Sequence, residues 1–163
     1  MHSALWAPWR MAYIRTLEGH SEAAKAAPPT GPVNFLAEYW AHPERDPEQH
    51  VVFRDAKGMI LLNRYPYTGG HLMVVPRRHT ASFEELPVEE LADLTLLLQR
   101  AVAHLKAEYR PDAVNLGMNL GRAAGAGIAD HVHWHIVPRW IGDTNFMPVL
   151  GEVRVIPEHL ETT

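Results

Sequence analysis

Short hydrophobic runs separated by turn-forming residues recur along the chain and predict β-strands. Three of them follow one another closely, at residues 51–55, 59–63 and 70–75, with glycine- or proline-containing breaks between them. Runs of about four to eight such residues, bounded by turns, are typical of strands. We therefore expect a three-stranded meander in the middle of the chain.

The longest periodic stretch, residues 86–109, predicts one long helix. Its leucine and valine positions recur at steps of three and four, which places them on one face of a helix. Pro87 suits the first turn, since proline lacks a backbone N–H that this turn would leave unpaired. A shorter helix is expected over residues 35–41, ended by Pro43.

Two further strands are expected after the long helix, at residues 113–120 and 131–138. The glycine-rich segment 121–130 joins them. Strands, one long helix and then strands again argue for an α+β fold with a mostly antiparallel, five-stranded sheet. We predict a single domain over residues 1–163, with an aromatic N-terminal arm and a flexible, proline-rich connector over about residues 1–32.

The last predicted strand carries three histidines in strict alternation. Residues 130–138 read Asp-His-Val-His-Trp-His-Ile-Val-Pro. Because successive side chains of a strand point to opposite faces, His131, His133 and His135 are expected on one face and three apolar side chains on the other. A lone histidine on a strand is usually a satisfied polar residue, but three in this pattern indicate a functional site.

Two chemistries suit such a row of histidines. Neutral imidazole is the commonest metal ligand. A strand rises about 3.3 Å per residue, so the Cα atoms of the outer two histidines lie roughly 13 Å apart. One zinc ion with Zn–N bonds of about 2.1 Å therefore binds all three rings only with strain. Imidazole is also a nucleophile near pH 7, and a neighbouring histidine can donate a proton to the leaving oxygen. The residues alone favour the second chemistry and leave the first open.

Composition narrows the setting of this site. The chain has 163 residues, of which 47% are hydrophobic, enough for a core. It has no cysteine, which excludes disulfides, thiolate zinc ligands and a redox pair. The formal net charge is -4, so the chain lacks the excess of basic residues that is typical of nucleic-acid binders. An anionic ligand would therefore have to be held by a local pocket. No apolar run approaches the roughly 20 residues that span a membrane, and we expect a cytoplasmic protein.

The histidine segment and several others resemble the histidine triad superfamily of nucleotide hydrolases and transferases. His-Val-His-Trp-His-Ile-Val matches the family signature His-φ-His-φ-His-φ-φ, in which φ is hydrophobic. The resemblance extends to Asn63, the strand that starts at Gly70, the loop 119–125 and residues 138–146. Together with the aromatic arm, these segments look closest to the bacterial branch that includes diadenosine tetraphosphate phosphorylases.

The resemblance implies a role for each histidine. His133 would be the nucleophile that attacks the α-phosphorus and carries a nucleotidyl intermediate. His135 would contact the bridging or leaving oxygen, and His131 with His71 would hold the array in register. Such an enzyme would open a dinucleoside polyphosphate, with phosphate or water accepting the nucleotidyl group.

The resemblance also implies a set of substrate-binding residues. They are Asn63 for the ribose hydroxyls, Asn119 and the backbone of Gly125 to Gly127 for phosphate oxygens, and Trp140 as a stacking surface for a second base. The loop GRAAGAG matches no standard phosphate-binding motif and alone is typical of a flexible turn. Beside the histidines its backbone N–H groups could form an anion-binding nest, and Arg122 could close on an outer phosphate.

Two positions depart from the family pattern. Many relatives carry a Cys-x-x-Cys pair that shares a zinc ion with two histidines; here residues 33–36 read Val-Asn-Phe-Leu, while His79 and His131 match the other two ligands. We therefore predict no structural zinc and no required cofactor, and leave open whether Mg²⁺ accompanies the polyphosphate. Hydrolase branches usually have glutamine four residues before the first triad histidine. Gly127 stands there, which leaves room for a phosphate acceptor.

Three functions stay open at this point. The first is cleavage of dinucleoside polyphosphates, the second is hydrolysis of an adenosine phosphoramidate or similar mononucleotide, and the third is nucleotide binding without catalysis. The arm residues Trp6, Trp9 and Tyr13 favour packing on the core or on a second subunit, because aromatic anchors are typical of interfaces. The resemblance implies a homodimer or a higher homo-oligomer.

Overall fold

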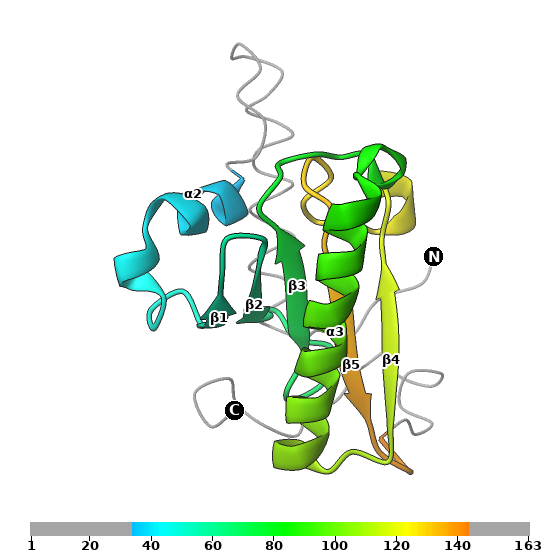
Figure 1. Ribbon diagram of the computed structural model, residues 1–163. Helices are drawn as coiled ribbons and strands as arrows, with labels where there is room; N and C mark the ends of the chain where they lie inside the picture. The colour runs from blue at the N-terminus through cyan, green and yellow to red at the C-terminus, as the bar shows by residue number, and fades with distance from the viewer. Residues whose placement is uncertain (1–33, 144–163) are drawn as a thin grey trace, which may run out of the picture.

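A five-stranded antiparallel sheet with one long helix across it is the framework of residues 34–143, which are the residues that the computed structural model describes (Figure 1). The strands are β1 (Val51–Arg54), β2 (Gly58–Leu62), β3 (Leu72–Pro76), β4 (Ala113–Met118) and β5 (Trp134–Arg139), in the spatial order β1-β2-β3-β5-β4. The helices are α2 (Phe35–Ala41) and α3 (Val88–Tyr109), with 3-10 turns at Pro43–Arg45, Phe83–Glu85 and Arg122–Ala124. The predicted α+β fold class is confirmed. The expected arm and connector over residues 1–32 lie outside the described residues, and the single domain over 1–163 stays a prediction.

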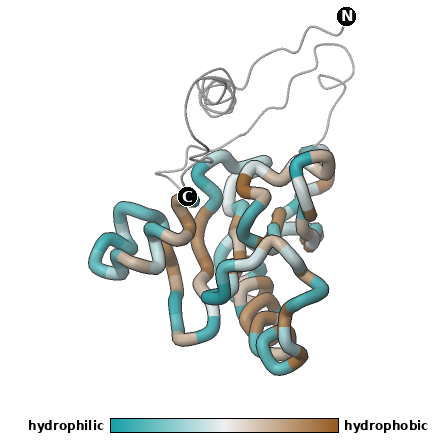
Figure 2. The backbone as a smooth tube through the Cα atoms, turned by 90° about the horizontal axis from the view of Figure 1, so that it is seen from above, coloured by the Kyte–Doolittle hydropathy of each residue, from teal (hydrophilic) through white to brown (hydrophobic). Residues whose placement is uncertain are grey.

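Strand alternation divides the core between the two faces of the sheet. On β3, Leu72 and Val74 belong to a buried cluster with α3. Met73 and Val75 belong to a second cluster with Leu36 of α2. Figure 2 shows the hydrophobic residues gathered along the strands and α3, with hydrophilic residues in the outer loops. One face of the sheet is therefore covered by α3 along its length, and α2 packs on part of the other.

The apolar stripe predicted for the long helix packs on the sheet. Of the predicted positions, Leu94 and Leu105 are buried, and Leu91, Leu98 and Val102 are partly buried against the same cluster. The helix also buries Leu97 and Ala101, which the predicted stripe did not include. Gly58 allows the close approach, because a Cβ there would lie 2.8 Å from Leu97 Cδ2. Pro87 lies just before the helix instead of in its first turn, and Arg110 ends it in the left-handed conformation, with φ of 48°. Within residues 34–143, no helix is both long and apolar enough to cross a membrane.

The predicted strand over residues 131–138 is shorter than expected. β5 begins only at Trp134, because the residues before it bond to the last residue of β3 and to the loop that follows β3, and do not extend the strand ladder. The N–H of Val132 donates to Thr80 O at 2.8 Å, and His131 Nε2 lies 3.0 Å from Pro76 O. The prediction that this whole segment is a strand was wrong, as was the extension of the preceding strand to residue 120, since β4 ends at Met118.

The predicted division of faces nevertheless holds. Val132, Trp134 and Ile136 belong to the cluster under α3. His135 pairs with Met73, whose side chain packs on the opposite face. The histidines therefore lie on the face away from α3, the face on which α2 packs.

Candidate functional site

The ring of His133 is oriented by the backbone next to it. The residue is 5% exposed, and its Nδ1 lies 2.8 Å from the carbonyl oxygen of His131. A carbonyl oxygen can only accept, so Nδ1 carries the proton and donates. In the neutral ring, Nε2 is therefore the nitrogen with the lone pair. Because His133 lines a pocket, this lone pair is suited to nucleophilic attack on a bound electrophile.

A chain of hydrogen bonds fixes the protonation of two further histidines. The backbone N–H of Tyr67 donates to His71 Nδ1 at 3.1 Å, and a backbone N–H can only donate. Neutral His71 then carries its proton on Nε2, which lies 3.0 Å from His135 Nδ1. His135 Nδ1 must accept, which leaves the proton of that ring on Nε2. His135 thus offers an N–H donor where His133 offers a lone pair.

Burial keeps the three triad histidines neutral. Desolvation is the largest cause at each of them: it lowers the pKa of His133, and it lowers the pKa of His131 and of His135 to about 4. At His135 the neighbouring His133 lowers the pKa further, whereas at His131 the bond to Pro76 O opposes the shift. The neutral forms required by the hydrogen bonds are therefore the forms present near pH 7.

These depressed pKa values predict a loss of stability in mild acid. The unfolded chain binds protons on these histidines below its ordinary pKa of about 6.5, whereas the folded chain resists protonation down to about pH 4. The free energy of unfolding should therefore fall as pH drops from 6.5 to 4, by roughly 3 kcal/mol for His131 alone. Urea titrations across this range measure it. The free energy of unfolding should change less steeply with pH in the variant His135→Asn than in the wild type. Equal slopes would contradict the assignment of a depressed pKa to His135.

A pocket lies beside these histidines on the face away from α3. It brings together five residues proposed from the sequence, namely Asn63, Gly125, Gly127, His133 and His135. Five other lining residues were not foreseen as part of the site; they are Phe35, Tyr65, Tyr67, Met73 and Ile128. A sequence signal existed for two of them, because tyrosines in the turn YPYTGG supply ring surfaces that a turn alone does not need.

The other predicted residues are not among the lining residues of this pocket. His71 and His131, each 1% exposed, are buried next to the lining histidines. Asn119 lies beside the loop, with Nδ2 4.0 Å from where a Cβ on Gly125 would be. Arg122 is exposed in a 3-10 turn, and Trp140 follows the far end of β5. Neither Arg122 nor Trp140 is among the lining residues that the structure describes.

The loop before the histidines is held by its own hydrogen bonds. Gly125 adopts a φ of 90°, which favours glycine, and its N–H donates to Arg122 O at 2.9 Å. The N–H of Ala126 donates to Gly121 O at 3.2 Å. Two of the backbone donors expected to bind phosphate are thus used within the loop, and they reach a phosphate only if the loop rearranges.

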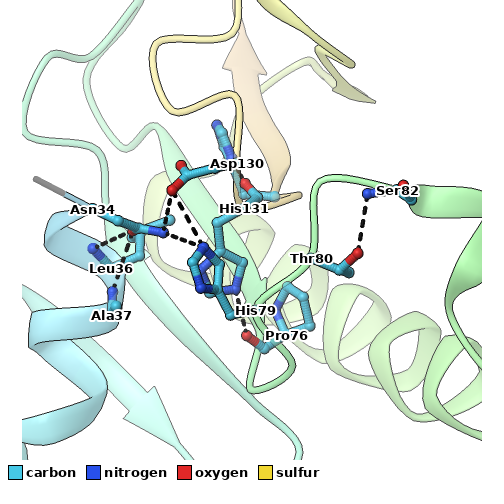
Figure 3. A network of polar contacts seen from close by, with 10 residues as sticks. Asn34, Leu36, Ala37, Pro76, His79, Thr80, Ser82, Asp130 and His131 are labelled. Carbon is cyan, nitrogen blue, oxygen red and sulfur yellow. Dashed lines mark hydrogen bonds and ion pairs between the residues drawn. The ribbon is translucent and has the colours of Figure 1, made fainter. Parts of the chain in front are cut away.

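At the outer end of the histidine row, Asn34 ties α2 to the histidine segment (Figure 3). Its Oδ1 caps α2 by accepting from the N–H groups of Leu36 and Ala37 at 3.1 and 3.3 Å. Its Nδ2 therefore donates to His79 Nε2 at 2.8 Å and to Asp130 Oδ2 at 3.4 Å. We call Asn34, His79 and Asp130 the clasp.

The clasp adjoins the positions where the family pattern puts zinc ligands, of which it contains only His79, and its residues do not fit a zinc ion. Asn34 lies within residues 33–36, the stretch where relatives carry the Cys-x-x-Cys pair, and its amide nitrogen donates to the Nε2 of His79. Among residues 34–143, no group of three or more His, Cys, Asp or Glu side chains could hold a metal. His131 Nδ1 is among the buried polar atoms that have no partner within this part of the chain, and it carries a lone pair because Nε2 donates to Pro76 O. The absence of zinc stays a prediction, which elemental analysis of the purified protein tests.

Loss of the clasp should weaken the attachment of α2. We expect Asn34→Ala to lower the free energy of unfolding by about 1–2 kcal/mol, because it removes a helix cap and a side-chain cross-link. Asn34→Ser keeps a capping oxygen without the amide donor, so its free energy of unfolding should lie between those of the wild type and Asn34→Ala. Urea unfolding of the three proteins measures the order, and an unchanged midpoint for Asn34→Ala would refute the role of the clasp.

The sheet and the histidine segment also match a known protein family. A family model described as HIT domain matches residues 44–140, more than half of the chain. The chain belongs to the HIT domain family. The match spans β1 to β5 and includes the four histidines of the site. The resemblance inferred from the sequence is therefore confirmed.

Individual relatives agree with this assignment. The chain is 39% identical over 159 residues to a Mycobacterium tuberculosis protein named AP-4-A phosphorylase, covering 98% of this chain and 79% of the relative. A zinc-bound histidine triad family protein from Mycobacterium smegmatis superposes with a TM-score of 0.59 at 27% identity, over 77% of this chain and 86% of its own. A protein from Sulfolobus tokodaii described as a hypothetical histidine triad nucleotide-binding protein superposes with a TM-score of 0.58 at 31% identity, over 65% of this chain and 70% of its own.

These relationships confirm that the chain is a histidine triad enzyme with a nucleotide-processing activity. They leave its substrate, its chemical intermediate and its oligomeric state as proposals. The arm residues Trp6, Trp9 and Tyr13, on which the expectation of a dimer partly rests, lie outside the described residues.

Proposed function

We propose that this protein cleaves dinucleoside polyphosphates such as diadenosine tetraphosphate through a nucleotidyl group carried on His133, with phosphate as the acceptor. The observation that carries the proposal is the opposite protonation of two adjacent rings. Nε2 of His133 has a lone pair, whereas Nε2 of His135 has a proton. Their centroids lie 5.0 Å apart, so both rings can reach one reacting phosphorus centre.

The first step exchanges one bond at the α-phosphorus for another. The lone pair of His133 Nε2 forms the P–N bond while the bond to the bridging oxygen breaks, and the leaving nucleotide departs with that electron pair. His135 stays neutral, because its pKa is about 4, and donates a hydrogen bond to the leaving oxygen instead of giving up its proton. The bond from His133 Nδ1 to His131 O stabilises the charge that develops on the attacking ring.

The second step returns the enzyme to its starting state. A phosphate oxygen attacks the same phosphorus, the P–N bond breaks and the lone pair returns to His133. Dividing one hard displacement into two lowers the highest barrier. Phosphate is favoured over water because Gly127, at the position where hydrolase branches usually have glutamine, lines the pocket without a side chain. The similarity to a protein named AP-4-A phosphorylase supports this acceptor.

Product analysis separates the acceptors. With diadenosine tetraphosphate and phosphate, we expect ADP and ATP in equal amounts; without phosphate, slow formation of AMP and ATP. Anion-exchange chromatography of both reactions measures the products. AMP and ATP as the main products in millimolar phosphate would contradict the assignment of phosphate as acceptor.

The same reactions test the two alternatives. A phosphoramidase would leave the dinucleotide intact and release AMP from adenosine 5′-phosphoramidate. A binding module would bind the nucleotide in calorimetry but would not turn it over with either phosphate or water as the acceptor. Either result would overturn the proposal.

A further inference from the structure

We propose that Thr68 is a positioning residue that sets which nitrogens of His71 and His135 carry protons, by anchoring the loop that presents the Tyr67 N–H. The catalytic consequence rests on the proposed function, whereas the protonation pattern does not. Thr68 is half-buried between β2 and β3 and is not among the residues that line the pocket. It would therefore act through the histidines instead of on the substrate.

The loop 63–71 is closed by hydrogen bonds near both of its ends. Asn63 Oδ1 accepts from the N–H of Tyr65 at 2.9 Å, and the N–H of His71 donates to Thr68 O at 3.3 Å. These bonds hold the loop to itself. They do not fix its distance from β5, the strand that carries His135.

The hydroxyl of Thr68 makes a second bond between this loop and β5, besides the bond from His71 Nε2 to His135 Nδ1. Its Oγ1 donates to Pro138 O at 3.1 Å, across 70 positions of sequence. Pro138 belongs to the same strand as His135, three residues further on. One strand thus holds the anchor of the loop and the ring that the loop controls. A shift of the loop relative to β5 would change the spacing along the series Tyr67 N–H, His71 and His135.

The spacing matters because each bond in this series dictates the next. While the Tyr67 N–H occupies His71 Nδ1, neutral His71 must donate from Nε2 to His135 Nδ1. Asn63 Nδ2 lies farther from the same nitrogen, at 3.4 Å, and is the weaker of its two donors. If the Tyr67 N–H withdraws, His71 can carry its proton on Nδ1 and accept at Nε2. His135 would then donate from Nδ1, and its Nε2 would become a lone pair. A lone pair there repels a leaving oxygen that the N–H would stabilise.

The structure offers a matched set of variants for the test. Thr68→Val keeps the shape and removes the hydroxyl, and Thr68→Ser restores it. Thr95→Val removes a comparable bond, from Thr95 Oγ1 to Leu91 O at 2.7 Å, on the exposed side of α3. Proteins labelled with ¹⁵N-histidine report the protonated nitrogen of each ring in two-bond ¹H–¹⁵N spectra near pH 7.

We expect protons on Nε2 of both His71 and His135 in the wild type, in Thr68→Ser and in Thr95→Val. In Thr68→Val the signals of both rings should move toward the Nδ1-protonated form. Its kcat for diadenosine tetraphosphate should fall by roughly 10-fold or more with KM nearly unchanged, because a donor to the leaving oxygen is lost. Thr68→Ser should recover most of this loss.

Two results would overturn the proposal. One is a wild-type spectrum with the proton on His71 Nδ1, which needs no variant and so does not depend on the folding of Thr68→Val. The other is wild-type protonation of both rings in a folded Thr68→Val protein. If the protonation shifts as expected but no dinucleotide is turned over by the wild type, the proposed function is wrong and the positioning role of Thr68 stands.

Discussion

Replacement of His133 by asparagine is expected to lower the turnover of diadenosine tetraphosphate by about 10⁴-fold or more. Asparagine can place its Nδ2 near the position of the imidazole Nδ1 and so keep the hydrogen bond to His131 O. What it lacks is the second ring nitrogen, which in our account forms the bond to phosphorus. The fold and the pocket should therefore survive while the chemistry is lost.

The measurement is kcat with saturating dinucleotide, with the unfolding midpoint and the Kd of a non-cleavable analogue as controls. Both controls should lie close to the wild-type values, since the backbone bond is kept. Turnover near the wild-type rate in a folded, ligand-binding His133→Asn protein would remove His133 from the role of nucleophile.

Replacement of His135 by asparagine should have an effect that depends on the leaving group. Asparagine Oδ1 can still accept from His71 Nε2, but the N–H donor on Nε2 of His135 is gone. Loss of one such donor costs about 10²–10³-fold when charge develops on the leaving oxygen. The loss should be largest for poor leaving groups and smallest for good ones, which need little stabilisation.

A series of adenosine 5′-aryl phosphates with different phenol pKa values measures this dependence. The plot of log kcat/KM against leaving-group pKa should be steeper for His135→Asn than for the wild type. For His133→Asn, in contrast, all substrates should be equally impaired. Parallel plots for wild type and His135→Asn would show that His135 does not act on the leaving oxygen.

The fold could be predicted because local patterns and tertiary packing agree. The three- and four-residue spacing of apolar positions in α3 corresponds to its buried face, and the alternation in the histidine segment corresponds to the two faces of the sheet. The extent of β5 could not be predicted. It depends on Thr80 O in the loop after β3, an acceptor more than 50 residues earlier in the chain, which takes the backbone N–H of Val132 in place of a strand partner.

The histidines of the candidate site could be predicted from the sequence, whereas several of the other residues that line the pocket could not. A signature of alternating histidines is local, whereas the pocket is completed by Phe35 from α2 and by Tyr65 and Tyr67 from a turn. Which of these segments meet depends on tertiary contacts such as the bond from Thr68 to Pro138. For the same reason, Trp140 is close to the histidines in sequence but lies beyond the far end of β5, outside the described lining of the pocket.

The most direct test of the account is to look for the nucleotidyl group on His133 itself. The enzyme is mixed with diadenosine tetraphosphate without phosphate, quenched in alkali during the first turnover because phosphoramidate bonds are acid-labile, digested, and mapped by mass spectrometry. We predict one adenylyl group on the peptide that contains residues 131–135, located on His133. An adenylyl group on a different residue, or first-turnover product formation with His133 unmodified at every time point, would contradict the central claim.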